Sequence, residues 1–159
     1  MYIYIGMAKA YVALGANMGD RAGTIRAALE RLDALPGVSV EAVSSLAETD
    51  PVGPVLDQPM FLNGATRLET ELQPRELLDA LLAVEAELGR VRTGPPGGPR
   101  PIDLDLLLFD ERLLDEPGLT VPHPRLHERR FVLEPLAELQ PGLKVPGKGT
   151  VEALLAKLD

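Results

Sequence analysis

Hydrophobic residues follow two different periods along this chain, and each change of period marks a new element. Residues 9–17 (KAYVALGAN) are mostly apolar and end in Gly and Asn, which is typical of a buried strand. Over residues 18–35 the apolar positions recur every three or four residues, which predicts a helix that stops before Pro36. Residues 38–49 predict a second strand, and the alternation over residues 60–72 predicts a third. The first half is therefore expected to fold as strand, helix, strand, strand.

The second half combines a long helix, an apolar strand and a helical C-terminal part. A helix is predicted from Pro74 to residue 90, since Pro suits the first helical position. The strand within residues 98–110 precedes a short hairpin. Residues 120–139 predict a turn with one or two helices, and Thr150 is expected to cap a last helix. Because several connections are only of hairpin length, the pattern favours an α+β sandwich with a mostly antiparallel sheet over a doubly wound parallel fold.

The length and the loops indicate how the chain is organised. A chain of 159 residues is expected to form one domain over residues 1–159, in which residues 1–8 are a leader or reflect an upstream start. Residues 50–59 contain three prolines, and residues 91–101 contain three glycines and four prolines. Both segments are therefore predicted to be loops.

The composition excludes several classes of protein. The chain has no Cys, which removes disulfides, thiolate nucleophiles and Cys-ligated metals and predicts a cytoplasmic location. No apolar run approaches the roughly 20 residues that span a bilayer, and no basic region precedes an apolar stretch as in a secretory signal. The net charge of −8 argues against a nucleic acid or an anionic membrane as partner.

The basic residues are nevertheless concentrated in one part of the chain. Of the 16 Lys and Arg residues, seven lie between positions 90 and 130, and all seven are arginines: Arg90, Arg92, Arg100, Arg112, Arg125, Arg129 and Arg130. Both histidines, His123 and His127, lie there too. The planar guanidinium group binds phosphate with two parallel hydrogen bonds, which the Lys ammonium cannot do. This cluster favours a phosphate-binding site over a merely solvated charged surface.

Two aspartates stand inside the most apolar strand. Side chains at i and i+2 of a strand share a face, so Asp103 and Asp105 are predicted to lie on one face with Leu107 and Phe109. Two carboxylates about 7 Å apart repel each other and lose hydration, and a divalent cation compensates both effects. Mg²⁺ typically takes one or two carboxylates together with substrate phosphates. The alternative is a solvent-facing sheet surface on which Arg100 pairs with one aspartate; the Gly/Pro loop and the arginines favour the metal site.

Weaker candidates occur elsewhere. Residues 142–149 (GLKVPGKG) nearly match a phosphate-binding loop, but Pro146 removes one backbone N–H and no buried strand precedes them, so a plain turn is predicted. Glu85 interrupts the apolar face of its helix and is a candidate acceptor for a polar ligand. Phe61 and Asn63 combine a ring with an amide that could bind a flat molecule, although core packing is the competing interpretation for Phe61.

Five ordered blocks give the chain a specific resemblance. The segment GGPRPIDLDLLLF resembles the signature of the 6-hydroxymethyl-7,8-dihydropterin pyrophosphokinase family of folate biosynthesis. The segments AYVALGANMGD, ETDPVGP followed by DQPMFLNGA, VEAELGRVR and LTVPHPRLHERRFVLEPLAEL extend the resemblance from residue 10 to about residue 140. It implies a ferredoxin-like three-layer α/β/α sandwich. The implied activity is transfer of pyrophosphate from ATP to the hydroxymethyl group of the pterin, with release of AMP.

The resemblance also implies a role for particular residues. Asp103 and Asp105 are expected to hold two Mg²⁺ ions, and Arg90 and Arg100 are expected to be catalytic on a mobile loop over residues 90–100. Contacts to ATP are expected from five residues: Arg92, Leu106, Thr120, His123 and Arg129. Two rings, Phe61 and Phe131, are expected to sandwich the pterin. Further contacts to it are expected from polar side chains and from the loop before Phe61: Thr49, Asp50, Val52, Asn63 and Glu85. The chain is expected to act as a monomer.

Some positions depart from the family pattern, and two rival functions stay open. Gly97 stands where Trp is common, which puts in doubt how the 93–99 loop closes over ATP. Another Mg²⁺-dependent nucleotide-using transferase would not need Phe61, Asn63 and Phe131. A ferredoxin-like module that only senses a ligand would not need two catalytic arginines, yet both are present.

Overall fold

The computed structural model describes residues 7–51, 55, 57–90 and 98–159. Its main sheet is built around strand β1 (Ala8–Ala16), which pairs with β4 (Phe61–Thr70) on one side and with β5 (Asp103–Phe109) on the other. On the far side of β4 lie β2 (Val38–Val43) and β3 (Ala47–Thr49), which pair with different parts of that strand. All these pairings are antiparallel, as the hairpin-length connections predict. Strand β5 is therefore an edge strand.

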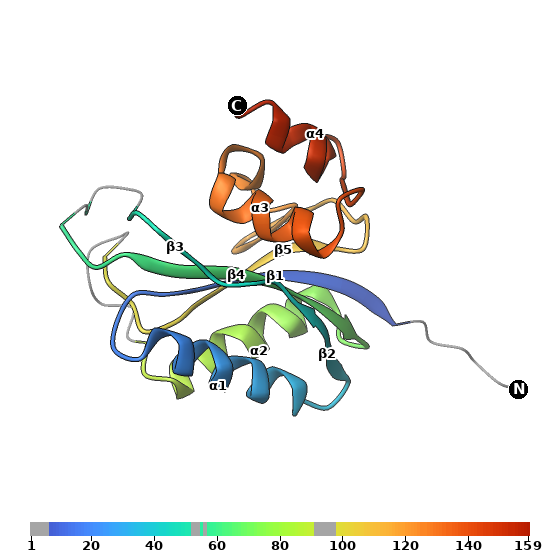
Figure 1. Cartoon of the computed structure of the whole chain (residues 1–159). Coiled ribbons are helices and arrows are strands. Elements are labelled where there is room, and N and C mark those ends of the chain that lie inside the picture. The colour runs from blue at the N-terminus through green and yellow to red at the C-terminus, as the bar shows by residue number, and fades with distance from the viewer. Residues whose placement is uncertain (1–6, 52–54, 56, 91–97) are drawn as a thin grey trace, which may run out of the picture.

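Helices cover both faces of the sheet (Figure 1). Helices α1 (Arg21–Asp33) and α2 (Pro74–Glu87) lie on one face, and α3 (Arg130–Leu139) and α4 (Val151–Ala156) lie on the other. A 3-10 turn over Leu126–Glu128 precedes α3. The arrangement is the three-layer, ferredoxin-like α/β/α sandwich that the resemblance implies. Among the described residues, no helix is long and apolar enough to cross a membrane.

Each face of the sheet has its own hydrophobic core. Alternate residues of β1, such as Val12 and Leu14, pack against α1 and α2, whereas Tyr11 lies in the core under α3 and α4. Strand β4 divides in the same way, because Leu68 joins the first core and Ala65 the second. The period-two pattern of these strands is thus explained by burial on both faces.

The predicted strand over residues 38–49 is two strands, and the break falls at Ser44. The Ser44 N–H donates to the Ala65 carbonyl (2.9 Å), and the Ser44 hydroxyl accepts from the Ala65 N–H at the same distance. A side-chain oxygen therefore takes the place of a backbone carbonyl, and the ladder is interrupted before β3 begins.

The prediction that Phe109 shares a face with the two aspartates is wrong. Val12 pairs with Leu106 and Tyr11 with Leu108, so Leu107 is an extra residue and β5 contains a β-bulge. Beyond the bulge the alternation is inverted: Leu107 and Leu108 both enter the α3/α4 core, and Phe109 packs on the α1/α2 side. The pattern therefore holds only as far as Leu107.

The remaining short elements agree with the sequence. Strands β6 (Leu114–Glu116) and β7 (Leu119–Val121) form the predicted hairpin. The near-match to a phosphate loop is a second hairpin, made by β8 (Lys144–Val145) and β9 (Gly149–Thr150), which confirms the plain turn. Thr150 caps α4 by accepting the N–H of Ala153. At the other end of the chain, β1 already begins at Ala8, which pairs with Thr70; residues 1–6 of the predicted leader lie outside the described residues.

Candidate active site

One row of residues across the sheet brings the candidate side chains together. Gly15 of β1 pairs with Asn63 of β4 on one side and with Asp103 of β5 on the other, so all three belong to the same face. A Cβ atom at Gly15 would lie 2.9 Å from Asn63 Oδ1, 3.8 Å from Asp103 Cβ and 3.9 Å from a ring carbon of Phe61. With no side chain of its own, Gly15 forms a floor between an aromatic–amide pair and an acidic residue.

The next row continues this floor toward the second aspartate. Ala13 pairs with Ala65 on one side and with Asp105 on the other. Ala13 and Ala65 lie against the α3/α4 core, so both aspartates are on that face of the sheet. In both rows, therefore, β1 places only a small residue between β4 and an aspartate of β5.

Asp103 is the centre of an ion network with two arginines. Arg90 Nη1 lies 2.6 Å from Asp103 Oδ1 and 2.8 Å from Glu85 Oε2, and it also donates to the Ile102 carbonyl. Arg100 Nη1 donates to the other oxygen of Asp103 at 3.2 Å, and the Arg100 guanidinium lies 5.3 Å above the Phe61 ring. The structure therefore places Arg90, Arg100 and Asp103 in contact, and their catalytic roles stay predictions.

Glu85 joins this network from the opposite layer. Its side chain on α2 is only 1% exposed and accepts the backbone N–H of Leu104 at 2.7 Å as well as Arg90. A carboxylate with these partners fixes the helix, the strand and the arginine relative to one another. The contacts thus make Glu85 a support for Arg90, and its predicted contact with the pterin stays a prediction.

Asp105 differs from Asp103 because no described group hydrogen-bonds its carboxylate. It is half-buried, and burial followed by the charges of Asp103 and Glu85 raises its pKa to about 7. A half-buried carboxylate without a donor fits a bound cation. Within the described residues no group of three or more His, Asp or Glu side chains is arranged to hold a metal. Two aspartates alone suit Mg²⁺ that also binds substrate phosphates.

A cavity of about 340 Å³ opens along the outer edge of β5. Its lining includes Asp105 together with three residues predicted to contact ATP, namely Leu106, Thr120 and His123. The backbone of His123 donates to the Leu107 carbonyl (2.9 Å), and its Nδ1 accepts the N–H of Arg125 (3.3 Å). Burial, and then the charge of Arg129, lower the pKa of His123, so the ring is neutral at pH 7 and Nε2 carries its proton.

The other predicted residues are placed less closely. The Arg129 guanidinium lies 5.6 Å from the Phe131 ring, and its Nε is buried without a hydrogen-bond partner among the described residues. Asn63 Nδ2 donates to Thr49 Oγ1, which joins β4 to β3. Asp50 is exposed, with no hydrogen bond to another described side chain. Two predicted contacts, Arg92 and Val52, and most of the predicted 93–99 loop, including Gly97, lie outside the described residues.

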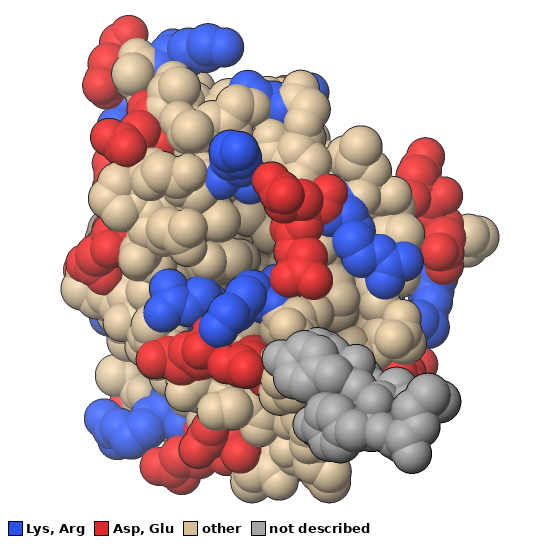
Figure 2. Space-filling model, turned by 90° about the vertical axis from the view of Figure 1, so that its right-hand side faces the viewer, with Lys and Arg blue, Asp and Glu red and all other residues tan. Residues whose placement is uncertain are grey.

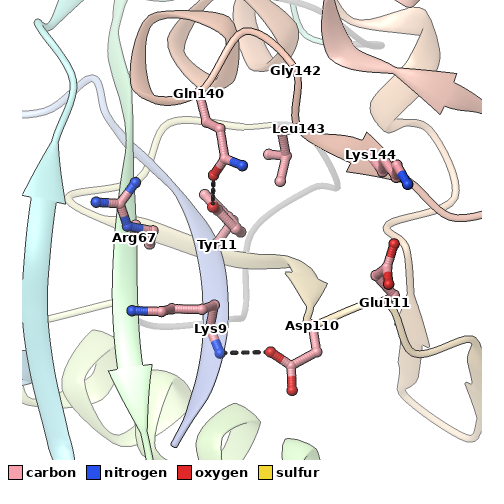
Figure 3. Close-up of a pocket in the computed structure, with 9 residues that line it drawn as sticks. All are labelled: Lys9, Tyr11, Arg67, Asp110, Glu111, Gln140, Gly142, Leu143 and Lys144. Atoms are coloured by element: carbon pink, nitrogen blue, oxygen red, sulfur yellow. Dashed lines mark hydrogen bonds between the residues drawn. The ribbon is translucent and has the colours of Figure 1, made fainter.

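A larger cavity of about 630 Å³ contains none of the predicted site residues (Figure 3). It lies at the other end of β1, around Lys9 and Tyr11, whose hydroxyl donates to Gln140 (2.6 Å). The Lys9 ammonium is already paired with Glu41 at 2.7 Å and Glu69 at 3.3 Å. On the face shown in Figure 2, Lys and Arg side chains likewise lie beside Asp and Glu side chains. This region therefore does not have the excess positive charge of a phosphate site.

Sequence reasoning missed three residues of this site. Gly15 and Ala13 form the floor, and a glycine inside a buried strand was the available signal for close approach of a ligand. Asn17, which ends the first predicted strand, is 1% exposed and contacts two distant segments. Nothing in its own neighbourhood of the sequence indicates these contacts.

An acidic pair with two arginines, beside a cavity lined by a histidine, fits the chemistry of enzymes that transfer phosphoryl groups. Comparison with known families identifies the particular one. Residues 11–141 match the model of 7,8-dihydro-6-hydroxymethylpterin-pyrophosphokinase, and the chain belongs to this family. Membership makes the chain a pyrophosphokinase of folate biosynthesis, which confirms the activity predicted from its sequence.

Curated relatives support the assignment over almost the full length. The chain is 50% identical over 148 residues to the 2-amino-4-hydroxy-6-hydroxymethyldihydropteridine pyrophosphokinase of Pseudomonas aeruginosa, covering 93% of this chain and 90% of that protein. It is 46% identical over 153 residues to the enzyme of the same name from Methylorubrum extorquens, covering 96% and 95%. Among solved structures, a Plasmodium falciparum HPPK-DHPS protein matches with a TM-score of 0.74 at 16% identity. That match covers 97% of this chain but only 44% of the Plasmodium chain, and it supports the fold.

Proposed function

We propose that the two rows around Gly15 and Ala13 are where the pterin hydroxyl and the phosphates of ATP meet. In this reaction the hydroxymethyl oxygen bonds to the β-phosphorus and the bond from that phosphorus to the α-phosphate oxygen breaks. AMP leaves, and the hydroxyl proton is released. The observation that carries the proposal is the row in which Gly15 separates Asn63 and Phe61 from Asp103.

The pterin is proposed to lie on the Asn63 side of this row. Strands β4 and β5 are separated by β1, so Asn63 and Asp103 are two strand spacings apart, roughly 10 Å. That width accommodates a flat bicyclic ring that stacks on Phe61 and forms hydrogen bonds with the Asn63 amide. Thr49, Asp50 and Phe131 are proposed as further contacts, with Val52 from the loop before β4.

ATP is proposed to lie along β5. The cavity beside Leu106, Thr120 and His123 would hold the nucleoside. The buried Nε of Arg129, which has no partner in the part of the chain that the structure describes, is a donor for a phosphate or ribose oxygen. Because burial keeps His123 neutral, its Nε2–H can donate to the ligand while Nδ1 stays bonded to the Arg125 N–H. Arg92 is proposed as an additional phosphate contact.

Asp103 and Asp105 are proposed to hold two Mg²⁺ ions together with the phosphates. When bound, Mg²⁺ withdraws charge from the phosphate oxygens and makes the β-phosphorus more electrophilic. Arg90 and Arg100 each contact one oxygen of Asp103, at 2.6 and 3.2 Å, and can turn their charge toward a phosphate that approaches this carboxylate. Positive groups at that position stabilise the charge on the departing AMP.

The assay measures the formation of AMP from ATP, Mg²⁺ and 6-hydroxymethyl-7,8-dihydropterin, with chromatography to detect the AMP. Pterin-dependent AMP that disappears with EDTA is expected, whereas release of ADP or of free pyrophosphate would indicate a different transferase. Binding of both ligands without any AMP would indicate the sensing module instead.

Matched variants test the residue roles in the same assay. Asp105→Asn is expected to lower kcat by at least about 100-fold, while Asp79→Asn, an exposed aspartate on α2, keeps it. Arg100→Ala is expected to lower kcat far more than it weakens pterin binding, with Arg125→Ala, whose side chain is 61% exposed, as its control. Normal turnover in Asp105→Asn would contradict the metal site. The monomeric state and the cytoplasmic location stay predictions, which light scattering and fractionation would check.

A further inference from the structure

We propose that Asn17 is a positioning residue that sets Arg100 relative to the pterin side of the site. This inference rests on the proposed function. Asn17 directly follows β1 and is 1% exposed, so its amide is shielded from water. A buried amide of this kind is costly unless its hydrogen bonds are made, and here they are made to two different segments of the site.

Both backbone polar groups of Arg100 bond to Asn17. The Arg100 N–H donates to Asn17 Oδ1 at 2.9 Å, and the Asn17 N–H donates to the Arg100 carbonyl at 3.2 Å. The pair therefore imitates one rung of a sheet ladder just before β5 begins. It fixes the backbone from which the Arg100 side chain reaches Asp103 Oδ2.

The other end of the Asn17 amide holds the segment that leads into β4. Asn17 Nδ2 donates to Gln58 Oε1 at 2.8 Å and to the Pro59 carbonyl at 3.0 Å, and Gln58 Nε2 in turn donates to the Val55 carbonyl. Phe61 begins β4 two residues after Pro59. The same amide thus places the backbone of Arg100 and the approach to Phe61.

A direct contact shows why these two positions need to agree. The Arg100 guanidinium lies 5.3 Å from the centre of the Phe61 ring, a cation–π distance. If the pterin stacks on Phe61, then a shift of the 58–59 segment relative to Arg100 would separate the bound hydroxyl from the arginine. Displacement of a reacting group by about 1 Å can cost on the order of 100-fold in rate. Only an amide serves all these contacts at this position, since Asp has no hydrogen to donate to Gln58 or Pro59.

The test is a double-mutant cycle on single-turnover AMP formation. Asn17→Asp keeps the acceptor for the Arg100 N–H but loses both donations, and we expect its rate to fall about 10- to 100-fold. In the Arg100→Ala background the same substitution is expected to change the rate by less than threefold, because the residue being positioned is absent. Binding of a non-hydrolysable ATP analogue is expected to stay within threefold in all four proteins.

A structural control and a second variant keep the outcome clear. Thr66→Val removes a buried hydrogen bond to the Ala42 carbonyl on the other face of β4 and should lower the melting temperature without lowering the rate. Gln58→Ala removes one of the two acceptors of Asn17 Nδ2, and it tests the same contact if Asn17→Asp folds poorly.

Each result has one meaning. No AMP from the unmodified enzyme would overturn the proposed function itself. With an active enzyme, a rate in Asn17→Asp or a stably folded Gln58→Ala within threefold of normal, or an equal loss in both backgrounds, would overturn the positioning role.

Discussion

Glu85 is a buried carboxylate, and its loss should lower the free energy of unfolding of the protein. Replacing it by Ala leaves the Leu104 N–H without its acceptor, which costs about 1–3 kcal/mol, and breaks a buried ion pair, which costs about 3–5 kcal/mol. These costs overlap. Arg90 also keeps Asp103 and the Ile102 carbonyl as partners, so the expected loss is about 3 kcal/mol in the free energy of unfolding. Glu85→Gln keeps an acceptor oxygen and should lose about 1–2 kcal/mol.

Urea unfolding followed by circular dichroism measures this difference, provided that the slope with denaturant is the same for each variant. Glu87 offers a matched control on the same helix, because its ion pair with Arg31 is exposed on both sides and should contribute less than about 1 kcal/mol. If Glu85→Ala lost no more stability than Glu87→Ala, the network around Arg90 would not have the energetic importance that its burial indicates.

Two further predictions concern the floor and the acidic pair. Burial, with the charges of Asp103 and Glu85, raises the pKa of Asp105 from 3.8 to about 7, so the folded state binds this proton more tightly and metal-free stability falls as pH rises from about 4 to 7. Asp105→Asn should remove that part of the pH dependence, on the order of 2 kcal/mol, in urea midpoints at pH 5 and 8; an unchanged slope would contradict it. Gly15→Ala should raise the KM for the pterin at least about tenfold by pushing against Asn63 Oδ1, with ATP-analogue binding unchanged. Gly142→Ala, with open space around its Cβ, is the control, and an unaltered KM in Gly15→Ala would place the pterin elsewhere.

Much of the fold could be predicted because local pattern and burial agree. The periods of the first strand, of the helix from Pro74 and of the Asp103–Asp105 segment all match the observed faces. The failures occur where a residue's partner is far away in the sequence. The bulge at Leu107 depends on how β1 pairs with β5, and the break at Ser44 depends on Ala65.

The same distinction applies to the site. Asp103, Arg90 and Arg100 could be named from a short segment and its resemblance, and the structure brings them together. Asn17 could not, since its partners lie 41 and 83 positions away and a lone Asn after a strand usually only ends it. The contact of the Glu85 side chain with Leu104 also depends on how α2 packs against β5, and the hydrophobic period of the helix does not specify this packing.

The bulge in β5 also restricts how this protein can vary in length. Leu107 is the extra residue, and its carbonyl is the acceptor that holds the backbone of His123. Removing one residue here would leave a regular strand with both aspartates still on their face, but the His123 backbone would lose the carbonyl that anchors it to the strand. An insertion within this segment would shift the Leu107 carbonyl relative to the rows of Gly15 and Ala13. Segment 103–107 therefore sets the distance between the acidic pair and His123. We expect natural or engineered changes of length to be tolerated in the hairpins beyond it rather than within it.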